Sequence, residues 1–555
     1  MDSNMSVSPD KDIKKSKGPP KWRSTRYSLV YLISTGLMVV FFQRVSFSVA
    51  IVCMVNHTAT DTQGQQQSEI SLNNFSTTPT SHSFNASRTM TSSQTVDSAA
   101  DGGDTKKCHR TDNETSSSDE DGPFLWDKNL QGLLLGALYW GYTVVQIPGS
   151  YVIQRRGARV VVGVAMLVMS AMHALCHPAA ILSPWAVFGL RVVMGLCTGL
   201  VIPAMYSVFA MWSPVAERAR LLSFAFAGQM IANASVFPAS ALLCDSDFLD
   251  GWPAIFYVFG GVGALWSICW FFAMSNDPES HSCISSAEVD YIVTSRSTVT
   301  AQKQKLSVPW RAILTSGCFW AIAVSQFTYN WGFFLMITNL PTYMAETMDV
   351  DIKSNGVFSM LPYICLFLVM NVTGYVSDFV TRRRYLSVAL TRKLFTCVGY
   401  VIPAVLLVVM SHQGCDAVLV VVTLMVIGVG LTGLANIGGF YINPYDIAPQ
   451  YATSICTATN TMATAAGIIN PYVVAAVTKN KTEEQWQTVF YITAVIFALG
   501  TAVFCVLGRG ELQSWALPPD QETQVEADHD NDLKFSNMDD GEAGSPNPAY
   551  IHETS

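Results

Sequence analysis

Apolar residues occur along this chain in long blocks, and short polar segments separate one block from the next. An α-helix rises about 1.5 Å per residue, so about 20 apolar residues cross the roughly 30 Å hydrocarbon core of a bilayer. Blocks of that length favour membrane-spanning helices. They predict twelve such helices, at 28–55, 128–154, 158–177, 184–210, 219–244, 252–274, 313–341, 354–379, 392–411, 416–441, 450–478 and 487–508.

The longer polar segments divide the predicted helices into two sets of six. The predicted fold class is therefore an all-α membrane protein, with twelve transmembrane helices in two six-helix halves that are related as parallel repeats. The expected parts are a basic N-terminal segment 1–27, a first half 28–274 that includes the loop 56–127, a central cytoplasmic loop 275–312, a second half 313–508 and an acidic tail 509–555.

Composition and charge support a membrane protein. Hydrophobic residues make up 50% of the chain, only 13% is charged, and the mean hydropathy is +0.30. Because soluble chains are about one-quarter charged, a soluble enzyme of several domains is excluded. The net charge of −8 comes from the tail 509–555, which carries −9 and leaves the rest of the chain at +1.

Basic residues indicate the orientation, since Lys and Arg concentrate in cytoplasmic loops. With a cytoplasmic N-terminus, 23 of the 33 basic residues lie on the cytoplasmic side, so both termini are predicted there. The Ser/Thr-rich loop 56–127 then faces the lumen or the exterior and is expected to be disordered. It carries four Asn-x-Ser/Thr glycosylation triplets, at Asn56, Asn74, Asn85 and Asn113. Cys108, Cys244 and Cys415 share that side, where a disulfide among them can form.

Two arginines, Arg44 and Arg191, lie inside predicted helices, where a charge costs about 2.5–3.5 kcal/mol. No Asp or Glu lies well inside any predicted helix, so neither arginine has an obvious carboxylate partner. The helix rise places Arg44 about 16 Å and Arg191 about 10 Å below the same outer face. We interpret them as a cationic site for an anion, because Arg can bind a carboxylate or phosphate through two parallel hydrogen bonds. The alternatives are snorkelling to the surface, hydrogen bonding to backbone carbonyl groups between helices and, for Arg191, close helix packing at Gly195 and Gly199.

Other intramembrane polar residues offer fewer candidates. Tyr329 and Asn330 on the seventh predicted helix are expected to face the central cavity and to contact substrate. No catalytic set, metal-ligand cluster or nucleotide-binding loop is present in the sequence, which predicts neither an enzyme nor an ATP-driven pump. Nothing in the sequence indicates nucleic-acid binding, and the expected partners are a small anion and the lipid bilayer.

The loop after the eighth predicted helix carries a recognisable pattern. Gly374, Asp378 and the run Arg382, Arg383 and Arg384 match the Gly-x-x-x-Asp-x-x-x-Arg-Arg pattern of the major facilitator superfamily. We expect these charged residues to act in gating at the cytoplasmic face. The corresponding loop of the first half keeps glycines and cations but lacks the Asp.

Five further stretches resemble the anion:cation symporter family of this superfamily, which contains sialin, the sodium/phosphate-type organic anion carriers and the vesicular glutamate transporters. These stretches are RVSFSVAIVCMVN at 44–56, WGYTVVQIPGSY at 140–151, WSPVAERARL at 212–221, WPAIFYVFG at 252–260 and the segment 437–471, which contains NPYDIAPQYA. The resemblance implies alternating access, transport of organic anions or phosphate, and two membrane arginines at Arg44 and Arg191.

The departures from the family bear on specificity and coupling. Thr198 stands where sialin and the glutamate carriers have a Glu, and Leu135 and Tyr329 replace a His and an Arg of the glutamate carriers. The stretch Tyr329-Asn330-Trp331 is more similar to sialin and the phosphate-type members. No resident cofactor is expected. Without a buried carboxylate, the group that usually binds the proton in a proton-coupled carrier is missing. Sodium coupling and voltage-driven uniport are both open.

Two alternatives to a carrier are open: an anion channel and a non-transporting sensor on the same scaffold. The tail motif Asn547-Pro548-Ala549-Tyr550 matches a signal that clathrin adaptors and phosphotyrosine-binding domains recognise. It favours the plasma membrane as the location, with a lysosomal or vesicular membrane as the alternative.

Overall fold

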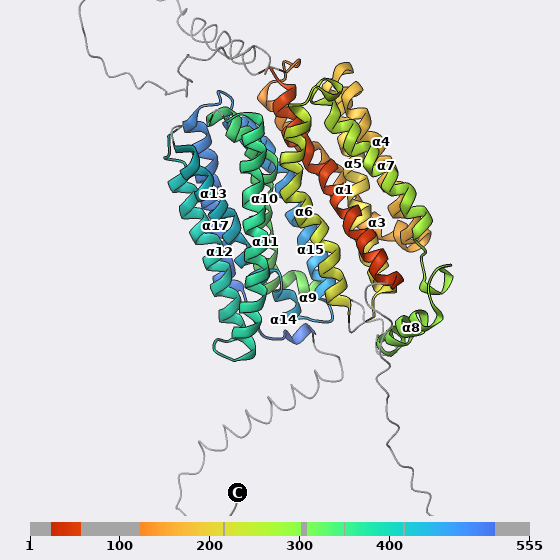
Figure 1. The fold of residues 1–555 in the computed structure, drawn as a ribbon. Coiled ribbons are helices and arrows are strands. Elements are labelled where there is room, and N and C mark those ends of the chain that lie inside the picture. The colour runs from red at the N-terminus through yellow and green to blue at the C-terminus, as the bar shows by residue number, and fades with distance from the viewer. Residues whose placement is uncertain are drawn as a thin grey trace, which may run out of the picture.

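A computed structural model describes residues 24–56, 122–214, 217–300, 308–348, 350–414 and 417–516. These residues form a bundle of long helices (Figure 1). The predicted fold class, twelve spans in two six-helix halves, is confirmed. By length and composition, nine helices of the described ranges qualify as candidate membrane spans. Three of the four predicted glycosylation sites (Asn74, Asn85 and Asn113) and the tail motif lie outside the described residues.

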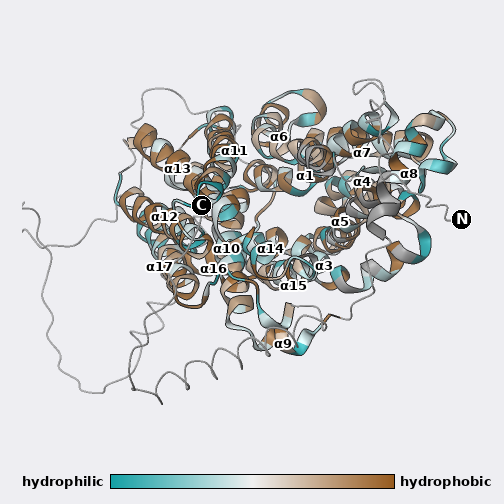
Figure 2. Ribbon diagram, turned by 90° about the horizontal axis from the view of Figure 1, so that it is seen from below, coloured by the Kyte–Doolittle hydropathy of each residue, from teal (hydrophilic) through white to brown (hydrophobic). Residues whose placement is uncertain are grey.

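The first six spans form a set that we call the N-terminal half. Seen from one end of the bundle, this half lies beside the second set, and apolar residues predominate on the helices of both (Figure 2). The helices of the N-terminal half are α1 (Thr25–Met54), α3 (Lys128–Arg156), α4 (Ala158–Leu182), α5 (Pro184–Trp212), α6 (Arg218–Cys244) and α7 (Pro253–Ala273).

The C-terminal half contains the remaining spans, two of which are interrupted. Its helices are α10 (Gly317–Thr347), α11 (Ile352–Arg382), α12 (Val388–Met410), α13 (Val418–Gly433), α15 (Ala452–Ala463), α16 (Ala465–Val477) and α17 (Glu483–Leu507). The predicted span 416–441 is α13 followed by a wide π-helical segment, η5 (Leu434–Phe440), in which Gly439 leaves helical geometry. The predicted span 450–478 is broken at Thr464 into α15 and α16.

Short helices complete the chain between and after the spans. They are η2 (Phe248–Asp250), η3 (Pro278–Ser280), α8 (Ser286–Thr300), α9 (Trp310–Thr315), α14 (Asn443–Ile447) and η6 (Ser514–Ala516). In α8, the hydroxyl of Ser285 accepts a hydrogen bond from the backbone N–H of Glu288 at 3.3 Å, which is half of a capping box.

The seventh span is longer than predicted, because α10 continues through Pro341 to Thr347. A proline removes one backbone donor, and membrane helices tolerate it where neighbours satisfy the freed carbonyl groups. At this proline, Asn355 of α11 donates its side-chain N–H to the Pro341 carbonyl at 2.8 Å, which joins α11 to α10. The extension brings Glu346 into the helix.

The two ends of the bundle differ in their cross-links. A disulfide joins Cys53 and Cys244 at the ends of α1 and α6, and we call this end the disulfide face. Cys244 was one of the cysteines expected on the outer side; its partner Cys53 was assigned to the first span. The opposite end, the α8 face, carries α8, α9 and α14 (Figure 1).

Small residues let the two halves approach closely near the disulfide face. A Cβ at Gly356 of α11 would lie 2.6 Å from the Cβ of Ala241 on α6, and one at Gly132 of α3 would lie 2.6 Å from the Pro471 carbonyl oxygen on α16. Such positions accept only glycine, and small residues are typical of helix contacts in membranes. The halves are therefore in direct backbone contact there.

A matching pair of side-chain contacts reflects the internal repeat. His177 of α4 lies 2.8 Å from the Tyr257 hydroxyl of α7, and His412 after α12 lies 3.0 Å from the Tyr491 hydroxyl of α17. These are the third and sixth spans of each half. The same histidine–tyrosine contact therefore joins corresponding helices, as parallel repeats predict.

Candidate functional site

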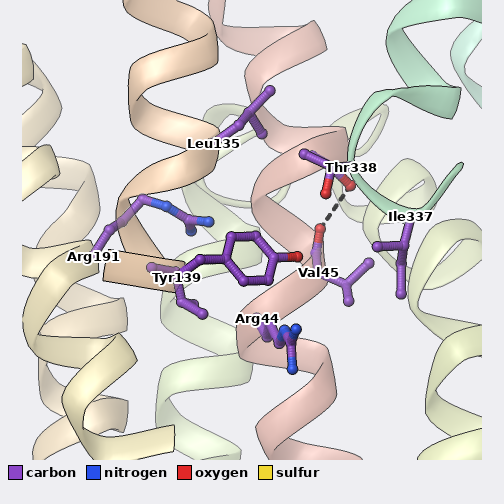
Figure 3. A pocket seen from close by; sticks show the side chains of 9 residues that line it. Arg44, Val45, Leu135, Tyr139, Arg191, Ile337 and Thr338 are labelled. Carbon is purple, nitrogen blue, oxygen red and sulfur yellow. Dashed lines mark hydrogen bonds between the residues drawn. The ribbon is translucent and has the colours of Figure 1, made fainter. Parts of the chain in front are cut away.

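A cavity between the halves brings the two predicted arginines together. It receives side chains from α1, α3, α5 and α10, and the space between them measures about 260 Å³, part of which is open to the surroundings (Figure 3). The lining residues are Arg44, Val45, Ser48, Leu135, Leu138, Tyr139, Arg191, Ile337 and Thr338. The lining contains two cations and no carboxylate, so the cavity carries a positive charge.

Arg44 is held in place by aromatic rings from both halves. Its guanidinium carbon lies 5.0 Å from the ring centre of Tyr139, 5.6 Å from that of Tyr142 and 5.4 Å from that of Phe334. Cation–π contacts of this kind stabilise a cation without neutralising it. The side chain is half-buried, and among the described residues none accepts a hydrogen bond from it. Its N–H groups are therefore available to an anion.

Arg191 is anchored more firmly. It is 3% exposed, its Nε donates to the Leu134 carbonyl at 2.9 Å, and its guanidinium lies 4.1 Å from the ring centre of Phe47. One of its donors is thus satisfied by the protein, while the group still lines the cavity. In Figure 3 the Tyr139 ring is drawn between the two guanidinium groups.

The helix rise explains why these residues share one level. Counting from the disulfide face, Arg44 lies ten residues before the end of α1, and Tyr139 eleven residues after the start of α3. Arg191 lies seven residues into α5, and Thr338 nine residues before the end of α10. At 1.5 Å per residue these depths fall between about 10 and 17 Å, close to the middle of a bilayer core.

The other predicted contacts lie elsewhere. Tyr329 stacks on Phe333 at 6.0 Å and contacts Phe440 at 6.0 Å, within the C-terminal half. Neither Tyr329 nor its half-buried neighbour Asn330 lines the arginine cavity. Thr198 is fully buried, and its hydroxyl donates to the Met194 carbonyl of its own helix at 2.9 Å. Substrate contact by Tyr329 and Asn330 and coupling through Thr198 stay predictions.

At the α8 face, Asp378, Arg382, Arg383 and Arg384 are exposed. Arg392 of α12 is buried at the same face, and the sequence did not predict a role for it. Its Nε and Nη2 donate to the two carboxylate oxygens of Asp446 at 2.7 and 3.2 Å. Asp446 belongs to the NPYDIAPQYA stretch, and that motif is the sequence feature that could have indicated a role for Asp446.

Arg26 forms a second network at the α8 face. It is 1% exposed, its Nε donates to Glu217 at 3.0 Å, and its Nη1 lies 3.5 Å from Glu288 of α8. The Glu288 carboxylate also accepts the backbone N–H groups of Thr25 and Arg26 at 3.1 Å each. A carboxylate at a helix N-terminus is favourable, so α8 is attached to the start of α1.

A third ion pair joins the halves near the disulfide face. The Lys128 ammonium of α3 contacts the Glu346 carboxylate of α10, and the two side chains are 9% and 1% exposed. The predicted seventh helix ends at residue 341 and therefore leaves Glu346 outside it. Asn56, the one predicted glycosylation site among the described residues, lies at the same face, where its backbone N–H donates to the Phe124 carbonyl at 2.9 Å.

Comparison with known proteins agrees with this architecture. A sequence profile of the Major Facilitator Superfamily matches residues 33–471. Human sialin is 34% identical over 91% of this chain and 93% of its own length. Vesicular glutamate transporter 2 of Bos taurus is 32% identical over 78% of this chain and 73% of its own. A putative inorganic phosphate cotransporter of Drosophila melanogaster is 31% identical over 91% and 88%.

Solved structures of low sequence identity share the fold. A bacterial homologue of the human lysosomal transporter Spinster, in an inward-facing conformation, superposes with a TM-score of 0.62 at 12% identity over 90% of this chain and all of its own. A D-xylose–proton symporter gives a TM-score of 0.58 at 11% identity over 88% of this chain and all of its own. At this identity the similarity concerns the fold alone.

Proposed function

Because this chain belongs to the major facilitator superfamily, we propose that it is a secondary active transporter that moves small anions across a membrane by alternating access. The observation that carries the proposal is the shared cavity of Arg44 and Arg191, whose lining holds two cations and no carboxylate. Two like charges within the membrane are costly when unpaired, and an anion between them would relieve that cost. The names of the relatives, sialin, glutamate transporter and phosphate cotransporter, support this class of substrate.

The two arginines would divide the binding work. Arg191, fixed by Leu134, provides a positioned charge, and Arg44, held only by rings, is free to form two parallel hydrogen bonds. The hydroxyl group of Tyr139 lines the same cavity and can bond a substrate oxygen, and Thr338 lies in the lining as well. This set suits a carboxylate or a phosphate; Tyr329 and Asn330 would enter the contact when the halves rearrange.

Alternating access would proceed by rocking one half against the other. We assign the disulfide face to the exterior or lumen and the α8 face, with both chain termini, to the cytoplasm, following the distribution of basic residues. In this structure Lys128–Glu346 and the Lys353–Asp245 pair, at 2.6 Å, join the halves at the outer face. Asp378 and Arg382–Arg384 would act when the cytoplasmic side closes.

The driving ion follows from the groups available. Thr198 stands where sialin and the glutamate carriers have an acidic residue. We therefore propose co-transport of sodium or movement driven by voltage, and a proton only through a group outside the arginine cavity. A potential of 100 mV supplies about 2.3 kcal/mol per charge. We place the protein in the plasma membrane, with lysosomal or vesicular membranes as the alternative. We propose that its tail motif at Asn547–Tyr550 binds a clathrin adaptor or a phosphotyrosine-binding domain.

Reconstituted vesicles test this function. Purified protein in proteoliposomes should take up labelled phosphate, sialic acid, glutamate, aspartate or urate under a set potential. Preloading with an excess of the unlabelled anion should accelerate uptake, because a carrier exchanges substrate and a channel does not. Uptake without exchange would indicate a channel, and binding without uptake would indicate a sensor.

A further inference from the structure

A second cavity lies entirely within the C-terminal half. It lies between α10, α12, α13 and α17, and the space between their side chains measures about 470 Å³, part of which is open to the surroundings. Its lining consists of apolar residues, glycines and one proline, apart from Thr432 and Thr493. We propose that this cavity binds the alkyl chain of a membrane lipid, and that the bound chain controls the arginine site.

The chemistry of the lining selects an apolar occupant. The Thr432 hydroxyl already donates to the Val429 carbonyl at 2.6 Å, and the Thr493 hydroxyl donates to the Val489 carbonyl at 3.0 Å. The Thr493 oxygen also accepts the indole N–H of Trp331 at 3.2 Å. Neither hydroxyl has a hydrogen left for a ligand, so a charged anion would lose its hydration without compensation.

The position of the cavity makes the bilayer the source of that occupant. The helices α12 and α13 lie at the edge of the bundle (Figure 2). Leu406 of α12 and Leu424 of α13 line the cavity and are half-buried. Their helices also expose Val405 (55%) and Ile427 (43%) on the bundle surface. An alkyl chain can therefore reach the cavity laterally from the bilayer.

The wall of the cavity leaves space for a chain. A Cβ placed on Gly428 would meet only Leu406, at 3.8 Å, whereas a Cβ on Gly332 would lie 2.6 Å from the Phe497 ring. The side chains of Met336, Met410 and Met425 also line the space, and unbranched methionine adapts to irregular ligands. Since an empty apolar cavity forfeits dispersion contacts with its walls, occupancy is favourable.

One helix separates this cavity from the arginine cavity. On α10, Phe333 and Met336 line the apolar cavity, while Ile337 and Thr338 line the arginine cavity. The two sites thus share a wall that is one helix thick. Whatever fills the apolar cavity fixes the position of α10, and α10 carries part of the anion site.

Aromatic contacts extend this wall to Arg44. The ring centre of Phe333 lies 5.9 Å from that of Phe334, and the Phe334 ring lies 5.4 Å from the Arg44 guanidinium. Displacement of Phe333 by a bound chain would therefore move the ring that contacts Arg44. This regulatory step rests on the proposed anion function; the binding of the chain does not.

Photolabelling tests the binding step. Protein is reconstituted with a phospholipid that carries a diazirine in its acyl chain; light expels nitrogen, and the carbene inserts into a nearby C–H bond. Met410 and Met425 are only 1% and 2% exposed, so bulk lipid does not reach them. We expect label on both, in addition to label on Leu419, which is 74% exposed. Label on Leu419 without label on the methionines would overturn the proposal.

A cavity-filling variant provides the matched comparison. Gly428→Leu should fill the space and lower methionine labelling at least tenfold. Thr432→Met should also lower the labelling. Gly261→Leu makes the same change at an exposed glycine of α7 that has no atom within 4 Å of the added Cβ, and should leave the labelling unchanged. Undiminished methionine labelling in folded Gly428→Leu or Thr432→Met would overturn the site.

Transport then tests the regulatory step separately. In proteoliposomes, the wild type and Gly261→Leu should change their anion uptake at least twofold as the acyl chains of the host lipid are lengthened, and Gly428→Leu should not respond. Equal responses of all three would overturn control of the arginine site. If none of the three proteins takes up an anion, while the wild type is still labelled at the methionines, that result would contradict the anion function alone.

Discussion

Lys128 and Glu346 form an ion pair that joins the two halves of the molecule, and each stands at the unfavourable end of its helix. Lys128 is the first residue of α3 and Glu346 the penultimate residue of α10. The helix dipole disfavours a cation at an N-terminus and an anion at a C-terminus. Both side chains are buried, and their contact offsets the unfavourable position of each charge. Their contact should therefore hold the outer side closed.

Breaking this pair should open the outer side. In Lys128→Ala or Glu346→Gln, a cysteine introduced into the arginine cavity as Ile337→Cys should react several-fold faster with a membrane-impermeant thiol reagent applied from the outside. The charge-swapped Lys128→Glu/Glu346→Lys protein should restore slow labelling, because the pair is re-formed. Asp245→Asn, which breaks the exposed Lys353 pair, is the control and should have a smaller effect. Equal labelling rates in all variants would show that the pair is no gate.

A buried pair in the C-terminal half should matter for stability. Asp446→Asn leaves Arg392 buried without its carboxylate, and removing one partner of a buried pair costs about 3–5 kcal/mol. We expect a clear fall in the thermal melting temperature of the detergent-solubilised protein. Asp378→Asn changes an exposed carboxylate of the same region and should leave melting nearly unchanged. Identical melting of the two variants would contradict the structural role of Arg392–Asp446.

The disulfide provides a test of both stability and orientation. The Cys53→Ser/Cys244→Ser protein should melt at a lower temperature, since a disulfide contributes about 2–4 kcal/mol. In intact cells, a membrane-impermeant reductant should open the bond, and mass spectrometry of the peptides after alkylation detects this. A bond that resists the reductant outside but yields to a permeant one would contradict the outward assignment of this face for a plasma-membrane protein.

The sequence predicted the helices better than the contacts between them. Blocks of apolar residues locate membrane helices because the bilayer imposes one length, and all twelve predicted spans correspond to helices. The errors arose where local signals compete with tertiary structure. The seventh predicted helix ends at residue 341, yet α10 continues through Pro341 to Thr347. Thr464 and Gly439 interrupt spans whose apolar pattern is continuous.

The candidate site, too, could be predicted from the sequence only in part. Arg44 and Arg191 were recognisable because a charge inside an apolar block is costly, and the helix rise placed them at one level. Pairing across distant segments leaves no such local signal. Arg26 with Glu288, Arg392 with Asp446 and Lys128 with Glu346 are separated by many residues, and only the fold brings them together.

The measurement that bears most directly on anion transport is uptake by Arg44 variants in proteoliposomes at equal protein content. Arg44→Ala should lower anion uptake more than tenfold, and Arg44→Lys should restore only part of it, because lysine keeps the charge but loses the paired hydrogen bonds. Arg155→Ala, which removes an exposed arginine at the α8 face, should transport like the wild type. Wild-type uptake in both Arg44 variants would contradict an anion site at this cavity.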